Sequence, residues 1–245
     1  MKASLRNLLA GAGVLAVLLV CLPFAAQRGW LGSGLREWLE QRRSEYSFNR
    51  IYAEPASSFK TTPNDFLRSA IGTAVPGRAL DVAMGEGRNA VYLASLGWKV
   101  TGFDVSEVGL QKALEHAKQA GVTIDAVHSS AESFDYGHEQ WDLVVLEYAP
   151  IHYDDAAFMQ RLRDSIRPGG YVLVETPVEW QNAKTKRPRV PGDLEPGELK
   201  SLFPGFEMVF YREAIGMSDW FPRETLIVRM LARKPDAQVP AAAAH

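Results

Sequence analysis

The chain has 245 residues, 47% of them hydrophobic, and its 27 basic and 29 acidic side chains give a formal net charge of −2. This length suits one large domain with a modest extension, and the near-neutral charge argues against nucleic acid as a substrate. The single cysteine, Cys21, excludes an intrachain disulfide.

Residues 1–27 are expected to form a membrane anchor or a signal segment. They contain an uncharged apolar run at 8–26, which approaches the length of a membrane-spanning helix. The sequence after the run is a poor signal-peptidase site, so a retained single-pass anchor is favoured over export after cleavage. Basic residues are denser after the run than before it, which predicts that the remainder of the chain faces the cytoplasm.

Residues 28–62 follow as a second predicted segment. Leu35–Tyr46 has apolar residues at helical spacing and is predicted to be an amphipathic helix, whereas Phe48–Phe59 reads as irregular. A further helix is predicted at Phe66–Thr73.

The stretch from 78 to 106 predicts a β-α-β unit. A strand at Ala79–Ala83 ends at a turn containing Gly85 and Gly87, a helix follows at Asn89–Ser95, and a second strand runs over Trp98–Asp104. Such a glycine turn suits a nucleoside-bearing cofactor. Asp81 stands before the turn, where its charge opposes a pyrophosphate but suits an ammonium and a sulfonium, and therefore favours S-adenosylmethionine over a dinucleotide.

The remaining elements continue the alternation of strands and helices. A helix capped by Ser106 is expected to run to Ala120 with Leu110, Leu114 and Ala117 inward. The later predicted elements are strands Ile124–His128 and Trp141–Glu147, helix Asp155–Ile166, strand Tyr171–Thr176, a short helix Pro196–Phe203, and an antiparallel pair at Phe206–Arg212 and Thr225–Arg233. The predicted fold class is therefore doubly wound α/β, with a seven-stranded, mostly parallel sheet and a disordered tail at 235–245.

Four blocks of this region together resemble the class I S-adenosylmethionine-dependent methyltransferases. They are D-V-A-M-G-E-G-R-N at 81–89, G-F-D-V-S at 102–106, W-D-L-V-V at 141–145 and R-P-G-G-Y-V-L-V-E-T at 167–176. The segment G-E-G-R-N-A-V-Y-L-A is most similar to the small-molecule branch around the tellurite-resistance methyltransferases. The resemblance covers 63–234 and implies a Rossmann-like methyltransferase domain, methyl transfer to a small molecule, and a preceding segment that covers the cofactor, with Tyr52 as the candidate covering residue.

The resemblance also implies roles for individual residues. Asp81 would face the methionine amino group, Gly85 and Gly87 would line the methionine and ribose, and the carboxylate of Asp104 would accept hydrogen bonds from the ribose hydroxyls. Ser130 stands where the family often has Asp beside the adenine. The other cofactor-binding candidates are Val82, Ala83, Asn89, Val105, Ala131, Glu132 and Glu147. Asp81 as an ordinary strand-end acid and Asp104 as a helix cap are the structural alternatives.

Methyl transfer is an in-line displacement that depends on alignment more than on acids and bases. If the acceptor must lose a proton, a base is expected after the fourth strand, where Tyr148 and His152 are the catalytic candidates. For His152, helix capping and a surface role are alternatives. No metal site is expected, because His152, Asp154 and Asp155 are too close in sequence to converge on one ion.

Other functions remain open from sequence alone. A nicotinamide-dependent oxidoreductase and a non-catalytic, membrane-tethered cofactor-binding subunit are the two alternatives. L-E-Y-A-P at 146–150 differs from the N-P-P-Y pattern of nucleic-acid amino methylases, so nucleic acid is not an expected partner. Trp180, Trp220 and Phe221 either line an apolar acceptor pocket or pack in the core. The oligomeric state is left open.

Overall fold

The computed structural model describes residues 33–54, 60–72, 74–178, 192–220 and 223–236. The chain divides into two compact units, Met1–Tyr46 and Ser47–His245. The predicted anchor at 8–26 and most of the predicted tail lie outside the described residues. Within the described ranges, none of the helices combines the length and the apolar character that a bilayer span requires.

Helix α2 (Ser33–Ala53) begins in the first unit and ends in the second. The helix predicted for Leu35–Tyr46 is thus confirmed, but the prediction of an irregular segment from Phe48 is wrong for the residues up to Ala53. The extension has no glycine or proline before Pro55. It also places Phe48 and Tyr52 one turn apart, with ring centroids 6.2 Å from each other, a spacing that stabilises the helix.

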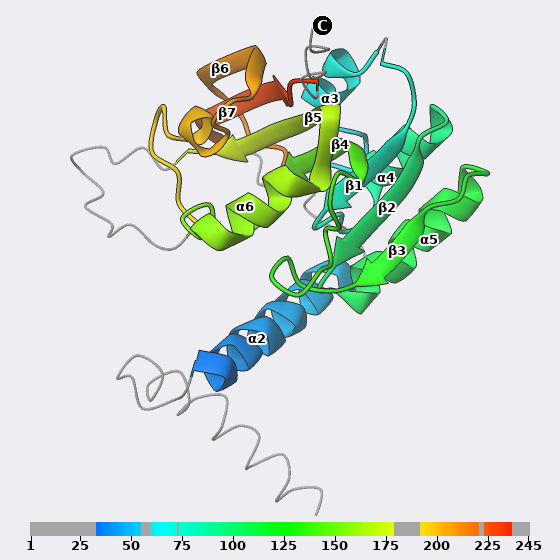
Figure 1. Cartoon of the computed structure of the whole chain (residues 1–245). Coiled ribbons are helices and arrows are strands. Elements are labelled where there is room, and N and C mark those ends of the chain that lie inside the picture. Colours follow the sequence, from blue (N-terminus) through cyan, green and yellow to red (C-terminus); the bar gives the residue numbers. More distant parts are fainter. Residues whose placement is uncertain (1–32, 55–59, 73, 179–191, 221–222, 237–245) are drawn as a thin grey trace, which may run out of the picture. The chain divides into compact units, whose positions relative to one another are not determined.

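The second unit contains a seven-stranded sheet in the order β3-β2-β1-β4-β5-β7-β6 (Figure 1). The first five strands are parallel to one another, whereas β7 is antiparallel to both β5 and β6. The strands are β1 Arg78–Val82, β2 Lys99–Asp104, β3 Asp125–His128, β4 Trp141–Glu147, β5 Ile166–Pro177, β6 Glu207–Met217 and β7 Glu224–Arg233. The predicted sheet with its antiparallel C-terminal pair is confirmed.

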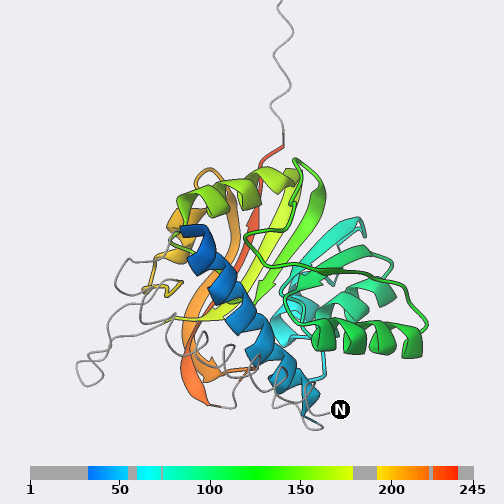
Figure 2. The same cartoon turned by 90° about the horizontal axis from the view of Figure 1, so that it is seen from below.

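Helices cover both faces of this sheet, as Figure 2 shows from below. Helices α3 (Asp65–Ala70), α4 (Arg88–Ser95) and α5 (Glu107–Gln119) enclose one hydrophobic core, and α6 (Ala156–Ser165) with the 3₁₀ helix η1 (Leu199–Leu202) encloses the other. Strand β4 contributes alternate residues to the two cores, Leu143 and Val145 to the first and Val144 and Leu146 to the second. Burial on both faces explains why this strand is a continuous apolar run.

Several element boundaries differ from the prediction. Strand β5 begins at Ile166 instead of Tyr171, and β6 continues to Met217 instead of ending at Arg212. These extensions are held by pairing with neighbouring strands, a non-local interaction that hydropathy does not register. In α5, Leu114 is 47% exposed, so the prediction that it points inward is wrong; Ala113 is the buried residue at that turn.

Candidate functional site

The turn after β1 has an unusual backbone conformation. Ala83, Gly85 and Gly87 all have positive φ, at 55°, 54° and 75°. At Gly87 a Cβ atom would come within 2.7 Å of the Cβ of Ala113, so the absence of a side chain also allows α5 to pack closely. The turn thereby brings backbone N–H groups to the carboxyl ends of β1 and β2, where open α/β sheets bind ligands.

An aromatic stack covers this turn. A Cβ atom at Gly85 would collide with the hydroxyl group of Tyr52, which is only 8% exposed. Tyr52 stacks on Phe48, and Phe48 stacks on Trp220 with ring centroids 5.9 Å apart. The last turns of α2 therefore reach the predicted cofactor-binding turn, and Trp220 lies in this stack. Trp180 and Phe221, the other candidates for an apolar pocket, lie outside the described residues.

Three carboxylates lie together at the ends of adjacent strands. Asp81 in β1 pairs with Gly102 in β2 and with Val145 in β4, and Asp104 and Glu147 follow these partners by two residues. Paired residues and residues two apart share a face of the sheet, so all three carboxylates point to the same side. They are 3%, 4% and 8% exposed for Asp81, Asp104 and Glu147.

Asp104 is held by the backbone around it. Its Oδ2 accepts a hydrogen bond from the N–H of Gly85 (2.9 Å), and its Oδ1 accepts one from Ser106 (2.8 Å). Burial raises the pKa of Asp104, although these bonds oppose the rise. Each carboxylate oxygen can accept a second bond, so the side chain retains capacity for ligand hydroxyls.

Asp81 is less well satisfied. It accepts a hydrogen bond from the backbone N–H of Ala90, but its buried Oδ2 has no hydrogen-bond partner in the described part of the chain. Burial raises the pKa of Asp81 to about 7, while the charge of Arg88 opposes that rise. A buried carboxylate oxygen without a donor is costly, and an ammonium group of a ligand would satisfy it.

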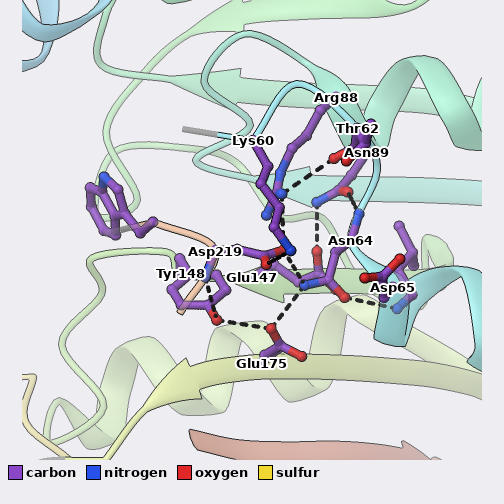
Figure 3. Close-up of polar contacts among 12 residues, drawn as sticks. Lys60, Thr62, Asn64, Asp65, Arg88, Asn89, Glu147, Tyr148, Glu175 and Asp219 are labelled. Atoms are coloured by element: carbon purple, nitrogen blue, oxygen red, sulfur yellow. Dashed lines mark hydrogen bonds and ion pairs between the residues drawn. The ribbon is translucent and has the colours of Figure 1, made fainter. Parts of the chain in front are cut away.

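Glu147 is another buried carboxylate whose hydrogen bonding is incomplete. Asn89 donates a hydrogen bond from Nδ2 to Oε2 of Glu147 at 2.6 Å (Figure 3), whereas Oε1 is buried without a hydrogen-bond partner among the described residues. Burial raises the pKa of Glu147 well above its ordinary value, with Arg88 opposing. Asn89 also accepts a bond from the backbone N–H of Asn64 (3.0 Å), which fixes its amide orientation.

A second group of polar side chains adjoins Glu147, as Figure 3 shows. Asn64 donates both amide hydrogens, to Glu175 Oε1 (2.9 Å) and to Asp219 Oδ2 (3.0 Å). The hydroxyl group of Tyr148 donates to the same oxygen of Glu175 (2.9 Å), and Arg229 pairs with the other carboxylate oxygen. Glu175 is thus fully partnered although it is only 1% exposed.

Asp219 is the second anion of this group. Lys60 lies 2.7 Å from its Oδ1 and Arg88 lies 3.0 Å from its Oδ2. Burial would raise the pKa of Asp219, but these two cations hold it below its ordinary value. The pairings join the segment before α3, the start of α4 and the loop between β6 and β7.

The other cofactor-binding candidates differ in their burial and contacts. The side chain of Val82 lies in the core that α6 and η1 enclose, so only its backbone reaches the site. The carbonyl oxygen of Val105 lies 3.0 Å from Nε2 of His128. Ser130 is buried and bonds to Ser133 within its own turn, Ala131 is half-buried, and Glu132 is exposed. Their roles stay predictions.

The two catalytic candidates have different surroundings. Tyr148 is buried, has a φ of 55°, and receives a hydrogen bond from the N–H of Asp219 (3.2 Å) as well as donating to Glu175. His152 has a side chain that is 47% exposed, with Nδ1 3.9 Å from Asp154. The structure thus joins Tyr148 to the polar network and places His152 at the surface; both catalytic roles stay predictions.

Sequence reasoning did not identify several members of the network, namely Lys60, Asn64, Glu175, Asp219 and Arg229. A signal existed for Glu175, which is an acid within an otherwise apolar strand, and for Asn64, which precedes the acid that opens α3. No local pattern distinguishes Asp219 from a surface acid. Its partners lie 131 and 155 residues away in the sequence, at Arg88 and Asn64.

Comparison with known proteins finds a methyltransferase domain in this chain. Residues 79–170 match the family model described as a methyltransferase domain. Hemagglutinin 1 of Eikenella corrodens is 26% identical over 185 residues, which cover 71% of this chain and 60% of that protein. A ubiquinone biosynthesis O-methyltransferase of Dinoroseobacter shibae is 33% identical over 135 residues, covering 55% of this chain and 51% of the relative. The matches thus span about half to three fifths of these relatives.

Solved structures share the fold. The N-methyltransferase NodS from Bradyrhizobium japonicum WM9, solved in complex with S-adenosyl-l-homocysteine, superposes with a TM-score of 0.59 at 15% identity, covering 79% of this chain and 99% of NodS. The predicted Rossmann-like fold is confirmed, and the match over residues 79–170 supports the predicted methyltransferase domain.

Proposed function

We propose that this protein transfers a methyl group from S-adenosylmethionine to a small-molecule acceptor. The observation that carries the proposal is the pair of buried carboxylates around the glycine turn, Asp104 and Asp81, the second of which has an oxygen that no donor reaches within the described residues. S-adenosylmethionine brings ribose hydroxyls and an ammonium group, which are donors of the kind that these oxygens require.

Each part of the cofactor has a matching group in the protein. Asp104 binds the ribose hydroxyls, and Asp81 binds the methionine ammonium through Oδ2, for which the described residues offer no donor. The backbone of Gly85 and Gly87 forms the turn beside these carboxylates, and a side chain at either position would collide with Tyr52 or Ala113. Tyr52 closes the site from the side of α2. The bound cofactor supplies the methyl group of its sulfonium.

The residues of this chain contribute mainly alignment. The displacement needs the acceptor atom in line with the methyl carbon and the sulfur, and a rigid frame of paired side chains supplies such alignment. Tyr148 belongs to that frame through its bonds to Glu175 and Asp219. His152 remains a candidate for removing the acceptor proton once the acceptor is bound.

Calorimetric titration of the full chain with S-adenosylhomocysteine and, separately, with NADH tests the proposal. We expect S-adenosylhomocysteine to bind and NADH not to bind, because Asp81 opposes a pyrophosphate. Binding of NADH alone would overturn the proposal in favour of an oxidoreductase. Binding of neither ligand would favour a non-catalytic subunit.

The location of the protein is a separate proposal. We propose that the run at 8–26 anchors the chain in a membrane with the methyltransferase domain in the cytoplasm. Support comes from the basic residues that follow the run and from the cytosolic supply of the cofactor. Protease added to intact spheroplasts should leave the domain uncut. Cleavage there would place it outside and favour export.

A further inference from the structure

Glu147 has a position that the cofactor does not account for. It lies on the same face of the sheet as Asp81 and Asp104, but in β4, on the side of β1 opposite to β2. If Asp104 in β2 binds the ribose and Asp81 in β1 binds the ammonium, Glu147 lies beyond both. Its neighbour on the other side is Glu175, its Cα partner in β5.

The unpartnered oxygen of Glu147 requires a donor. Oε2 accepts from Asn89, but Oε1 is buried and has no hydrogen-bond partner in the described part of the chain, and the residue is only 8% exposed. Leaving a buried acceptor unbonded is costly. The side chain is fixed in place by Asn89, which is itself held by Asn64 (Figure 3), so the oxygen does not turn away to find a partner.

We propose that Glu147 binds the methyl acceptor through Oε1, and that the acceptor therefore presents an N–H or O–H group, as an amine or a hydroxyl does, and not an oxyanion. The inference rests on the proposed function, because it takes the positions of the ribose and the ammonium as given. It adds a residue that touches the substrate and a chemical class for that substrate.

The surrounding charges support this class. The cations of the adjoining network already have carboxylate partners: Arg88 and Lys60 pair with Asp219, and Arg229 pairs with Glu175. An anionic acceptor would thus oppose the ionisation of Glu147 and Asp81, whose pKa values are already raised, and these three cations are already paired. A neutral N–H or O–H donor, which keeps a lone pair for the attack, would instead complete the hydrogen bonding of Glu147.

The same contact accounts for the proton that the acceptor loses in the reaction. A lone pair of the acceptor nitrogen or oxygen forms the new bond to the methyl carbon, the bond from carbon to sulfur breaks with its electrons passing to sulfur, and the acceptor proton passes to Oε1 of Glu147 instead of to His152. Burial raises the pKa of Glu147, which makes its carboxylate a better proton acceptor.

Two cofactor analogues test the proposal without knowledge of the acceptor. Sinefungin carries an amine where S-adenosylmethionine carries its transferable methyl group, whereas S-adenosylhomocysteine carries nothing there. Titrated into the full chain, sinefungin should bind more tightly than S-adenosylhomocysteine. Glu147→Gln should weaken sinefungin by about tenfold, as expected for loss of a charged hydrogen bond, and change S-adenosylhomocysteine by less than about twofold.

Asp81→Asn is the matched control. Both analogues carry the methionine ammonium, so this change should weaken them equally. Equal weakening of both by Glu147→Gln would overturn the proposal by placing Glu147 on the methionine, and no change in either would also overturn it. Glu147→Asp, which retains the charge with a shorter reach, should lie between wild type and Glu147→Gln, and serves if the latter does not fold.

Failure of the proposed function has a different signature. If the wild-type chain binds neither analogue, the cofactor assignment itself fails, and the Glu147 assignment fails with it. If the wild type binds both with equal affinity, the cofactor assignment stands and only the role of Glu147 is overturned.

Discussion

The two halves of the site are built in different ways. On the side of β1 and β2, residues 81–106 form one continuous stretch, and backbone N–H groups hold the acid at its end. On the side of β4, β5 and β7, side chains from separate segments hold one another, with Asn64 and Glu175 joined across 111 residues. The first half follows from a local motif, and the second exists only after the chain has folded.

The halves also differ in how their charges are satisfied. Asp81 has an oxygen that no donor reaches within the described residues, whereas Glu175 and Asp219 have a partner for each oxygen; Glu147, where the two halves meet, resembles Asp81 in this respect. Unsatisfied groups are suited to binding a ligand, and paired groups are suited to stabilising a frame. We therefore expect changes in the first half to alter cofactor affinity and changes in the second to alter stability.

The largest expected effect is on stability, from Glu175→Ala. Removing this carboxylate leaves Arg229 without its ion-pair partner and deprives Asn64 and Tyr148 of one buried hydrogen bond each, which should lower the free energy of unfolding by about 3 kcal/mol or more. Chemical denaturation measures this. Glu207→Ala is the control, because Glu207 also pairs with an arginine of β7 but is exposed, and should cost about 1 kcal/mol or less. Equal losses of unfolding free energy in Glu175→Ala and Glu207→Ala would contradict the distinction between the two halves.

The next effect is on cofactor affinity, from Asp104→Ala. Loss of a charged acceptor for the ribose should weaken S-adenosylhomocysteine by about 1.5–3 kcal/mol, measured by calorimetry. Asp125→Ala, at an exposed acid on the neighbouring strand β3, should leave the affinity unchanged. An unaltered affinity in Asp104→Ala would refute the ribose assignment.

A third effect is a pH dependence of binding. The pKa of Asp81 is about 7 because the group is buried, so below pH 7 the ammonium of S-adenosylhomocysteine meets a protonated carboxyl. Binding then requires loss of that proton, and affinity should fall by up to about tenfold per pH unit below 7 and level off above it. Asp81→Asn should reduce this slope. The pH dependence that remains should come from Asp104 and Glu147, whose pKa values are also raised. A slope unchanged by Asp81→Asn would assign the proton to another group.

The smallest expected effect is that of Lys60→Ala. The side chain of Lys60 is 46% exposed, and Asp219 keeps its bond to Arg88, so stability should fall by less than about 1 kcal/mol. Thermal unfolding of this variant beside Arg88→Ala, whose side chain is 17% exposed, compares the two partners of Asp219. A greater loss of stability in Lys60→Ala than in Arg88→Ala would show that side-chain exposure does not predict the strength of these two ion pairs.

Sequence reasoning recovered the parts of the molecule that depend on short-range patterns. The glycine turn, Asp81 and Asp104 were readable because their spacing in a β-α-β unit is set by backbone geometry. The continuation of α2 past Phe48 was missed, because the packing of Tyr52 over Gly85 stabilises it from far along the chain. Asp219 was missed because its burial depends on cations from two other segments.

Asn64 couples the start of a helix to the frame of the site. Its side-chain oxygen caps α3 by accepting from the N–H groups of Phe66 (2.7 Å) and Leu67 (3.0 Å), while its amide nitrogen binds Glu175 and Asp219. One side chain cannot leave either set of bonds without disturbing the other. Protection of the Phe66 and Leu67 amides from solvent exchange therefore reports on the integrity of a carboxylate more than a hundred residues away, and loosening the site and fraying the helix become a single cooperative opening.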